Sequence, residues 1–216
     1  MKPVGVLRFP GTNCDQDILR WMEILKKPAQ YLWHQDLFQW QDYSMLILPG
    51  GFSYGDYLRS GALAARSPVM KSVHEFASHG GPVLGICNGF QILCEAQLLP
   101  GVLMQNQGRR FIDDWVDLEI VSENNKFIKD KKSKTRAEMS LPIAHGDGRY
   151  FHDEKGLLEL HANQQIWLRY KNNPNGSVEN IAGVFNKQKN VAGLMPHPER
   201  ALFDWMGGVD GLFFLD

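Results

Sequence analysis

One cysteine stands inside a turn motif, Gly85-Ile86-Cys87-Asn88-Gly89, that fits a catalytic nucleophile. Residues 82–86 are short, apolar and partly β-branched, which is typical of a buried strand. Residues 90–99 carry a helical apolar pattern that Pro100-Gly101 ends. A strand that turns into a helix over G-x-C-x-G is a nucleophile elbow, and the helix N-terminus favours a thiolate. We therefore predict that Cys87 is a nucleophile; the alternative is a buried structural cysteine beside a flexible turn.

A base for this thiol is present near the C-terminus, in Pro196-His197-Pro198-Glu199-Arg200. In an extended segment, side chains two positions apart project to the same face, so His197 and Glu199 should be neighbours. The imidazole could then take the proton of the thiol while the carboxylate holds the imidazole in the correct tautomer. The alternative is a proline-rigid surface turn whose charges are solvated.

A glycine pair, Gly50-Gly51, follows the apolar residues 46–48. Acyl transfer through a cysteine generates an oxyanion, and glycine lets backbone N–H groups approach such a charge closely. The backbone N–H of Asn88, directly after the cysteine, is the natural second donor. No Gly-Lys-Ser/Thr follows at the spacing of a phosphate-binding loop, so the pair predicts an oxyanion site or a simple turn.

Strands and helices alternate through the first half of the chain, as the scaffold of such a site requires. The predicted strands are residues 4–9, 29–33, 45–48, 83–86, 116–121, 166–170, 181–185 and 191–195. Helices are predicted at residues 69–78, after the cysteine, and after a cap at Thr12 or Asn13. The alternation predicts a parallel sheet with the nucleophile at the carboxyl ends of its strands. The last two strands should form a hairpin in a strand-rich C-terminal half.

Length, charge and cysteine usage indicate the class of protein. A chain of 216 residues suits one α/β domain, so we expect residues 1–216 to form a single domain. The formal net charge of -1 offers no case for binding nucleic acid or an anionic membrane. Three cysteines without metal or disulfide spacing, together with the lack of an apolar run of transmembrane length, predict a soluble cytoplasmic protein without a metal.

Taken together, the elbow with Gln91, the Pro49-Gly50-Gly51 loop and His197-Pro198-Glu199 resemble a triad-type glutamine amidotransferase domain. The resemblance covers residues 3–214. It is sharpest at residues 10–15, 50–57, 144–150, 173–177 and 195–201. These stretches are similar to the family of glutaminase subunits of phosphoribosylformylglycinamidine synthases, which are enzymes of purine biosynthesis.

The resemblance implies a fold, a reaction and partners. The fold is a three-layer, flavodoxin-like α/β sandwich around a mostly parallel central sheet. In the reaction, Cys87 is the nucleophile that forms a thioester with glutamine, His197 the base and Glu199 the carboxylate that orients it. The residues expected to hold glutamine are Gly50, Gly51, Phe52, Asn88, Gln91, His145 and Gly146. Ammonia should pass to a large synthetase subunit, accompanied by a small accessory subunit. ATP and magnesium are expected on the synthetase, and no cofactor is expected in this chain.

Other functions and other site residues remain open at this point. A γ-glutamyl hydrolase or a peptidase could use the same fold, although Asn88 stands where that kind of peptidase has a histidine. A non-catalytic interaction protein is a third possibility, against which the intact triad speaks. His145, with Asp147 two residues later, competes with His197 as the base. Cys14 is a possible second activated thiol without an evident base, and Cys94 fits the core. A basic run at residues 126–136 is interpreted as a solvated loop.

Overall fold

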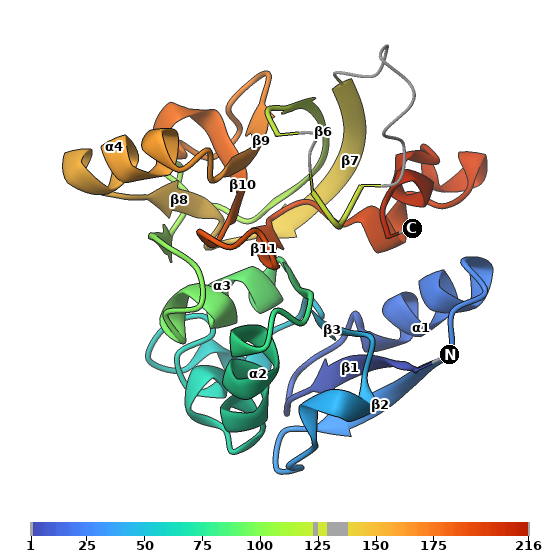
Figure 1. Ribbon diagram of the computed structural model, residues 1–216. Helices are drawn as coiled ribbons and strands as arrows, with labels where there is room; N and C mark the ends of the chain where they lie inside the picture. The colour runs from blue at the N-terminus through green and yellow to red at the C-terminus, as the bar shows by residue number, and fades with distance from the viewer. Residues whose placement is uncertain (1, 123–124, 129–137, 216) are drawn as a thin grey trace.

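A nine-stranded sheet forms the centre of the computed structural model, which describes residues 2–122, 125–128 and 138–215 (Figure 1). The strands of this sheet are β1 (Val4–Arg8), β2 (Ala29–Trp33), β3 (Met45–Leu48), β4 (Val83–Ile86), β6 (Ile112–Ile120), β7 (Glu138–His145), β9 (Ile166–Tyr170), β10 (Ile181–Phe185) and β11 (Val191–Leu194). Strands β5 (Val102–Met104) and β8 (Arg149–Phe151) pair separately. Most of the basic run lies outside the described residues.

The strand order is β2-β1-β3-β4-β11-β10-β9-β6-β7. Pairing is parallel from β2 to β11 and antiparallel from β11 to β7. The strand directions alternate across the antiparallel part, so only β10 and β6 run against the other seven strands. The expected α/β fold with a mostly parallel sheet is therefore confirmed, and so are the strand-rich C-terminal half and the β10–β11 hairpin. Strands β4, β11 and β7 consequently end at the same edge of the sheet.

In the part of the chain that the structure describes, four α-helices accompany the sheet: α1 (Asp15–Ile24), α2 (Val69–Ser78), α3 (Asn88–Glu95) and α4 (Glu154–Ala162). Short 3-10 turns lie at Trp40–Asp42, Ser53–Asp56, Ala64–Arg66, Val178–Asn180, Pro198–Arg200, Asp204–Met206 and Asp210–Phe213. From β1 the chain passes through α1 to β2, which lies on one side of β1 in the sheet. From β3 it passes through α2 to β4, which lies in the opposite direction along the strand order. Right-handed connections in opposite directions place these two helices on opposite faces (Figure 1).

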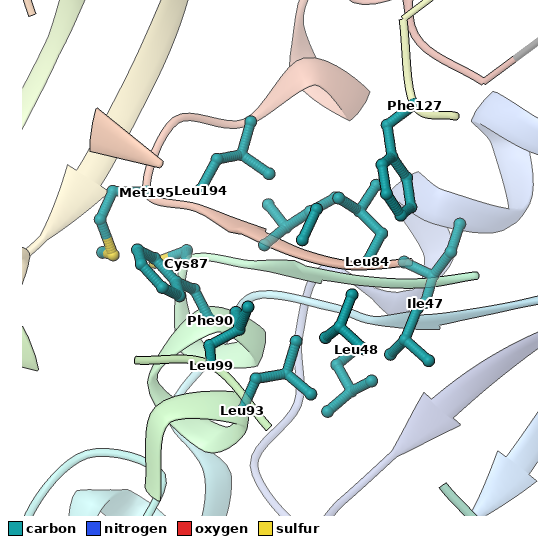
Figure 2. Close-up of a cluster of buried hydrophobic side chains, with 14 of the residues drawn as sticks. Ile47, Leu48, Leu84, Cys87, Phe90, Leu93, Leu99, Phe127, Leu194 and Met195 are labelled. Carbon is teal, nitrogen blue, oxygen red and sulfur yellow. The ribbon is translucent and has the colours of Figure 1, made fainter. Parts of the chain in front are cut away.

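The core fills both faces of the sheet. Figure 2 shows Phe90, Leu93 and Leu99 on the α3 side of the strands and Phe127 on the other side, with Cys87 at the edge of the cluster. Cys94 is buried in the same core, as expected. Among the described residues, no helix has the length and apolar content that a membrane crossing requires.

Two sequence-based expectations about helices are wrong in detail. Helix α1 begins after Cys14, which occupies the N-cap position without a side-chain cap. Thr12 instead accepts a hydrogen bond from the backbone of Phe9, because the loop closes on itself before the helix starts. Helix α3 begins directly after Cys87 and ends at Glu95, earlier than the apolar pattern predicted. The apolar residues that follow α3 pack as a loop rather than as a further helical turn.

Candidate active site

Cys87 stands at a strained turn between β4 and α3. Its backbone has φ 50° and ψ −105°, which a non-glycine residue adopts only where the surroundings enforce it. The flanking glycines are required by packing. A Cβ on Gly89 would lie 1.9 Å from the carbonyl oxygen of Leu48, and a Cβ on Gly85 would lie 2.6 Å from that of Gly89. The geometry confirms the predicted elbow, with the thiol at the N-terminus of α3, where the helix dipole favours negative charge.

His197 and Glu199 form a buried hydrogen-bonded pair after β11. Nδ1 of His197 lies 2.6 Å from Oε1 of Glu199, and the two residues are 2% and 1% exposed. Their segment is not the extended chain that the spacing suggested, because residues Pro198–Arg200 form a 3-10 turn. The turn still brings the two side chains together. The carboxylate therefore fixes the ring through Nδ1 and leaves Nε2, which has no hydrogen-bond partner among the described residues, facing away from Glu199.

Parallel pairing of β4 with β11 brings the thiol and the imidazole together. Leu194 lies opposite Ile86, and the backbone N–H of Cys87 donates to the carbonyl of Leu194. Cys87 and His197 meet at Gly50, where an added Cβ would lie 2.8 Å from Cε1 of the imidazole and 3.5 Å from Cβ of the cysteine. The structure thus places these side chains around one point, although they are far apart in the sequence.

The surroundings of His197 favour its protonated form. Burial alone would lower the pKa of this imidazole. The charge of Glu199, then that of Cys87 and the contact with Cys14, instead raise the pKa well above the ordinary value of 6.5. A histidine of this kind can hold a proton taken from a thiol, which stabilises a thiolate–imidazolium pair.

Backbone donors lie beside the thiol. Asn88 directly follows Cys87 as the first residue of α3, so its N–H has no partner within the helix. The Gly50-Gly51 loop is held by the segment after β1. The N–H of Phe52 donates to the carbonyl of Gly11 at 3.0 Å, and that of Cys14 donates to the carbonyl of Gly50 at 3.2 Å. A fixed loop of this kind can present N–H groups to an oxyanion without reorganising.

Cys14 and Arg200 belong to the site, although sequence reasoning gave neither of them a role there. Nη2 of Arg200 lies 3.1 Å from Sγ of Cys14, and Nε of Arg200 lies 3.2 Å from Oδ2 of Asp17. Burial raises the pKa of the Cys14 thiol, while His197 and Arg200 oppose that shift. The signal that could have found Cys14 is its position in the glycine-containing loop between β1 and α1, which follows the carboxyl end of β1 as the Gly50 loop follows that of β3.

A cavity of about 110 Å³ opens onto the thiol. Its lining residues are Asn13, Cys14, Gly51, Phe52, Cys87, Phe111, Ala144, His197 and Arg200. The thiol of Cys87 donates to the carbonyl of Ala144 at 3.7 Å. A second cavity of about 400 Å³ also reaches His197, from the side of Trp115 and Trp205. The imidazole is therefore accessible to small molecules despite its burial.

The other predicted glutamine-binding residues surround this cavity rather than line it. Gln91 receives a hydrogen bond on Oε1 from Asn88 at 2.9 Å and donates from Nε2 to the carbonyl of Asp147 at 2.6 Å. Asn88 in turn accepts at 3.2 Å from the N–H of Ser53. These bonds link the elbow to the Gly50-Gly51 loop and to the loop after β7. A direct contact of the Gln91 or Asn88 side chain with glutamine stays a prediction.

His145 ends β7 at the same edge of the sheet. Its Nδ1 lies 3.1 Å from Oδ1 of Asn106, and its carbonyl accepts from Nδ2 of Asn106 at 2.8 Å. Burial, reinforced by His197, lowers the pKa of His145 to about 4, so the ring is neutral at pH 7. The carboxylate of Asp147, which could have oriented this ring, accepts from Ser60 instead. The geometry therefore favours His197 as the base, and the neighbouring Gly146 stays a predicted substrate contact.

Comparisons with known proteins show the family to which the chain belongs. Residues 2–209 match the CobB/CobQ-like glutamine amidotransferase domain. The chain is 54% identical over 213 residues to the phosphoribosylformylglycinamidine synthase subunit PurQ of Helicobacter hepaticus, covering 99% of this chain and 95% of that protein. It is 52% identical over 210 residues to the PurQ of Wolinella succinogenes, covering 96% and 95%.

A solved structure extends the agreement to the fold. The structure of PurLQS from Thermotoga maritima contains a chain that matches with a TM-score of 0.88 at 44% identity, covering 98% of this chain and 95% of that one. Sequence and structure therefore match over nearly the whole length of these relatives. The chain belongs to the family of CobB/CobQ-like glutamine amidotransferases, the family of these PurQ subunits.

Proposed function

We propose that this chain is the glutaminase subunit of a phosphoribosylformylglycinamidine synthase. It hydrolyses glutamine to glutamate and supplies ammonia to a synthetase that converts phosphoribosylformylglycinamide to phosphoribosylformylglycinamidine. The observation that carries the proposal is the meeting of Cys87 with the His197–Glu199 pair at the Gly50 loop. The relatives that are named PurQ support the choice of this synthase among the amidotransferases.

The first half of the reaction forms a thioester. The imidazole of His197 takes the proton of the Cys87 thiol, and the thiolate attacks the side-chain amide carbon of glutamine. The carbonyl oxygen becomes an oxyanion that accepts hydrogen bonds from the N–H of Asn88 and from the Gly50-Gly51 loop. When the oxyanion collapses, the carbon–nitrogen bond breaks. The leaving nitrogen takes the proton back from the imidazolium and departs as ammonia.

The second half releases glutamate. The neutral imidazole of His197 now removes a proton from water, and the hydroxide attacks the γ-glutamyl thioester. Collapse of the second oxyanion breaks the carbon–sulfur bond, and Cys87 receives the proton back from the imidazolium. Glu199 does not change its protonation in either half; it holds the ring and stabilises its positive charge.

We also propose how glutamine is held and where the protein works. Phe52, 46% exposed at the cavity mouth, and the backbone of Gly51 would contact the substrate, with Gln91, His145 and Gly146 around it. ATP and magnesium would act on a large synthetase subunit, with a small accessory subunit beside it. Residues 1–216 would act as one domain, because a continuous sheet connects the two halves of the site. Three free cysteines are consistent with the reducing cytoplasm.

The test compares two nitrogen sources in the complex assembled with the synthetase. Replacing Cys87→Ala should abolish glutamine-dependent synthesis and leave ammonia-dependent synthesis intact, because only the first uses the thiol. Equal loss of both activities would contradict the proposal. A glutamine-mimicking electrophile should label Cys87 and leave Cys94 unlabelled in peptide mass spectrometry. Strong cleavage of γ-glutamyl peptides by the free chain would favour a γ-glutamyl hydrolase.

A further inference from the structure

The Ser53–Asp56 turn closely follows the Gly50-Gly51 loop, and its backbone is strained. Tyr54 has φ 54° and ψ 27°, Gly55 has φ 68° and ψ 20°, and Asp56 has φ 55°. Three consecutive residues therefore lie in the left-handed region, which is unfavourable for a side chain as bulky as that of tyrosine. A backbone of this kind persists only where surrounding contacts hold it. The reaction described above assigns no role to this turn.

The side chain of Tyr54 supplies such contacts. Its hydroxyl lies 2.8 Å from Nδ1 of His34 and 2.9 Å from Oγ of Ser67. A hydroxyl can donate one hydrogen bond and accept others, so a single tyrosine can satisfy both partners. The backbone N–H of Tyr54 adds a hydrogen bond to the carbonyl of Pro10 at 2.6 Å. Side chain and backbone together therefore hold the turn in its left-handed conformation.

The partners of the Tyr54 hydroxyl are themselves fixed by the fold. His34 directly follows β2, and Ser67 lies two residues before α2. Both are buried, at 9% and 6% exposure. The backbone N–H of His34 donates to the carbonyl of Arg8 at the end of β1, and the N–H of Val69 in α2 donates to the carbonyl of His34. The hydroxyl is thus bonded to residues whose positions the sheet and α2 determine.

The same turn holds the residue that follows the nucleophile. The N–H of Ser53 donates to Oδ1 of Asn88 at 3.2 Å, and Nδ2 of Asn88 lies 3.4 Å from Oδ1 of Asp56. The N–H of Asn88 is a proposed oxyanion donor, and the strained backbone of Cys87 requires that the peptide between these two residues be held in place. The Gly50-Gly51 loop, which carries the other proposed donors, leads into this turn. Both groups of donors are therefore connected to the segment that Tyr54 holds.

We propose that Tyr54 is a positioning residue for the oxyanion site, acting through the bonds of its hydroxyl to His34 and Ser67. The inference rests on the proposed glutaminase function. Without the hydroxyl, the turn can relax toward ordinary backbone angles, and the N–H of Ser53 shifts relative to Asn88. The oxyanion donors are then still present, but they are no longer aimed at the charge that develops on the carbonyl oxygen of glutamine. Because this charge exists only after the thiolate attacks, kcat should fall while KM changes little.

The test is Tyr54→Phe, with Tyr43→Phe as the matched control. Tyr43 is a buried tyrosine whose hydroxyl also has a partner, Nε2 of Gln30 at 2.7 Å, but it lies before β3, at the opposite end of that strand from the site. Removal of a whole oxyanion donor costs about 100- to 1000-fold in kcat, and a misaimed donor should cost less. We expect kcat for glutamate release to fall about 10- to 100-fold in Tyr54→Phe, KM to change less than about threefold, and Tyr43→Phe to stay within about twofold of wild type. A kcat within twofold of wild type in Tyr54→Phe, or an equal fall in both variants, would overturn the proposal.

An aldehyde analogue of glutamine separates the aim of the donors from a loss of folded protein. The thiol of Cys87 adds to the aldehyde carbon, and the aldehyde oxygen then takes the place of the oxyanion. The affinity for this analogue should fall in Tyr54→Phe by about the same factor as kcat, because both depend on the same donors. Unchanged affinity would refute the positioning role. Should Tyr54→Phe not fold, Ser67→Ala removes one of the two partners and should lower kcat and this affinity by a smaller factor, about threefold; no change in either would contradict the proposal.

Hydrogen exchange measured by NMR tests the contact itself, without any substrate. The amide of Ser53 should exchange at least about tenfold faster in Tyr54→Phe than in Tyr43→Phe, because its bond to Asn88 depends on the turn. Equal exchange rates in the two variants would refute the proposal. If the wild-type chain releases no glutamate, the proposed function fails, and the exchange rate of Ser53 still decides whether Tyr54 holds the turn against the elbow.

Discussion

Gly50 is the position at which a single added carbon should separate the thiol from its base. In Gly50→Ala the new Cβ would lie 2.8 Å from Cε1 of His197 and 3.0 Å from Sγ of Cys14. Ordinary carbon–carbon contacts are about 3.5–4.0 Å, so the imidazole must retreat by roughly 0.7–1.2 Å. A displacement of about 1 Å between reacting groups costs about 100-fold in rate, or roughly 2.7 kcal/mol in the activation barrier.

The assay follows glutamate release and ammonia-dependent synthesis in the assembled complex. We expect kcat/KM for glutamine to fall about 100-fold in Gly50→Ala while ammonia-dependent synthesis is unchanged. Overpacking also costs about 1–3 kcal/mol of stability, so the melting temperature is measured alongside. The matched control is Gly108→Ala, because a Cβ there would meet nothing within 4 Å. Glutamine hydrolysis within twofold of wild type in Gly50→Ala would refute the proposed contact between this loop and the catalytic pair.

Three further predictions concern titration and packing. Glu199 raises the pKa of His197, so protonation of this ring stabilises the fold below about pH 6.5, and this stability is lost as the pH rises through the raised pKa. Melting temperatures measured against pH should show this loss in wild type and a smaller loss in Glu199→Gln. The pH dependence of stability that His145 contributes has the opposite sign. Its pKa is lowered to about 4, so it should cost stability as the pH falls from about 6.5 to 4, and His145→Gln should remove up to about 3 kcal/mol of that acid sensitivity in urea titrations. Asn190→Ala should lower the free energy of unfolding by about 1–3 kcal/mol, since its buried amide donates to the carbonyls of Ala77 and Gly81; a smaller change in Asn190→Ala than in an exposed control, Asn163→Ala, would contradict this.

Local sequence was sufficient to predict the structure where a few neighbouring residues determine the backbone conformation. The elbow at Cys87 and strands β3, β4, β10 and β11 were predictable, because short apolar runs between glycines or turn residues leave few alternatives. Strand β7 was missed, since Pro142 lies within it and proline normally argues against a strand. Helix α4 was missed because only Gly156 and Leu160 are buried along it, so its apolar pattern is weak.

The residue types by themselves therefore determined the chemistry: a cysteine at a forced turn, a histidine two positions from a carboxylate, and glycines for an oxyanion. Only the tertiary structure decided which groups meet. Pairing of β11 with β4 places His197 beside Cys87, the loop after β1 adds Cys14, and Asn106 contacts the ring of His145. The physical reason is that nucleophile, base and donors stand on separate strands. Their proximity depends on strand order and register across the sheet, which no local pattern encodes.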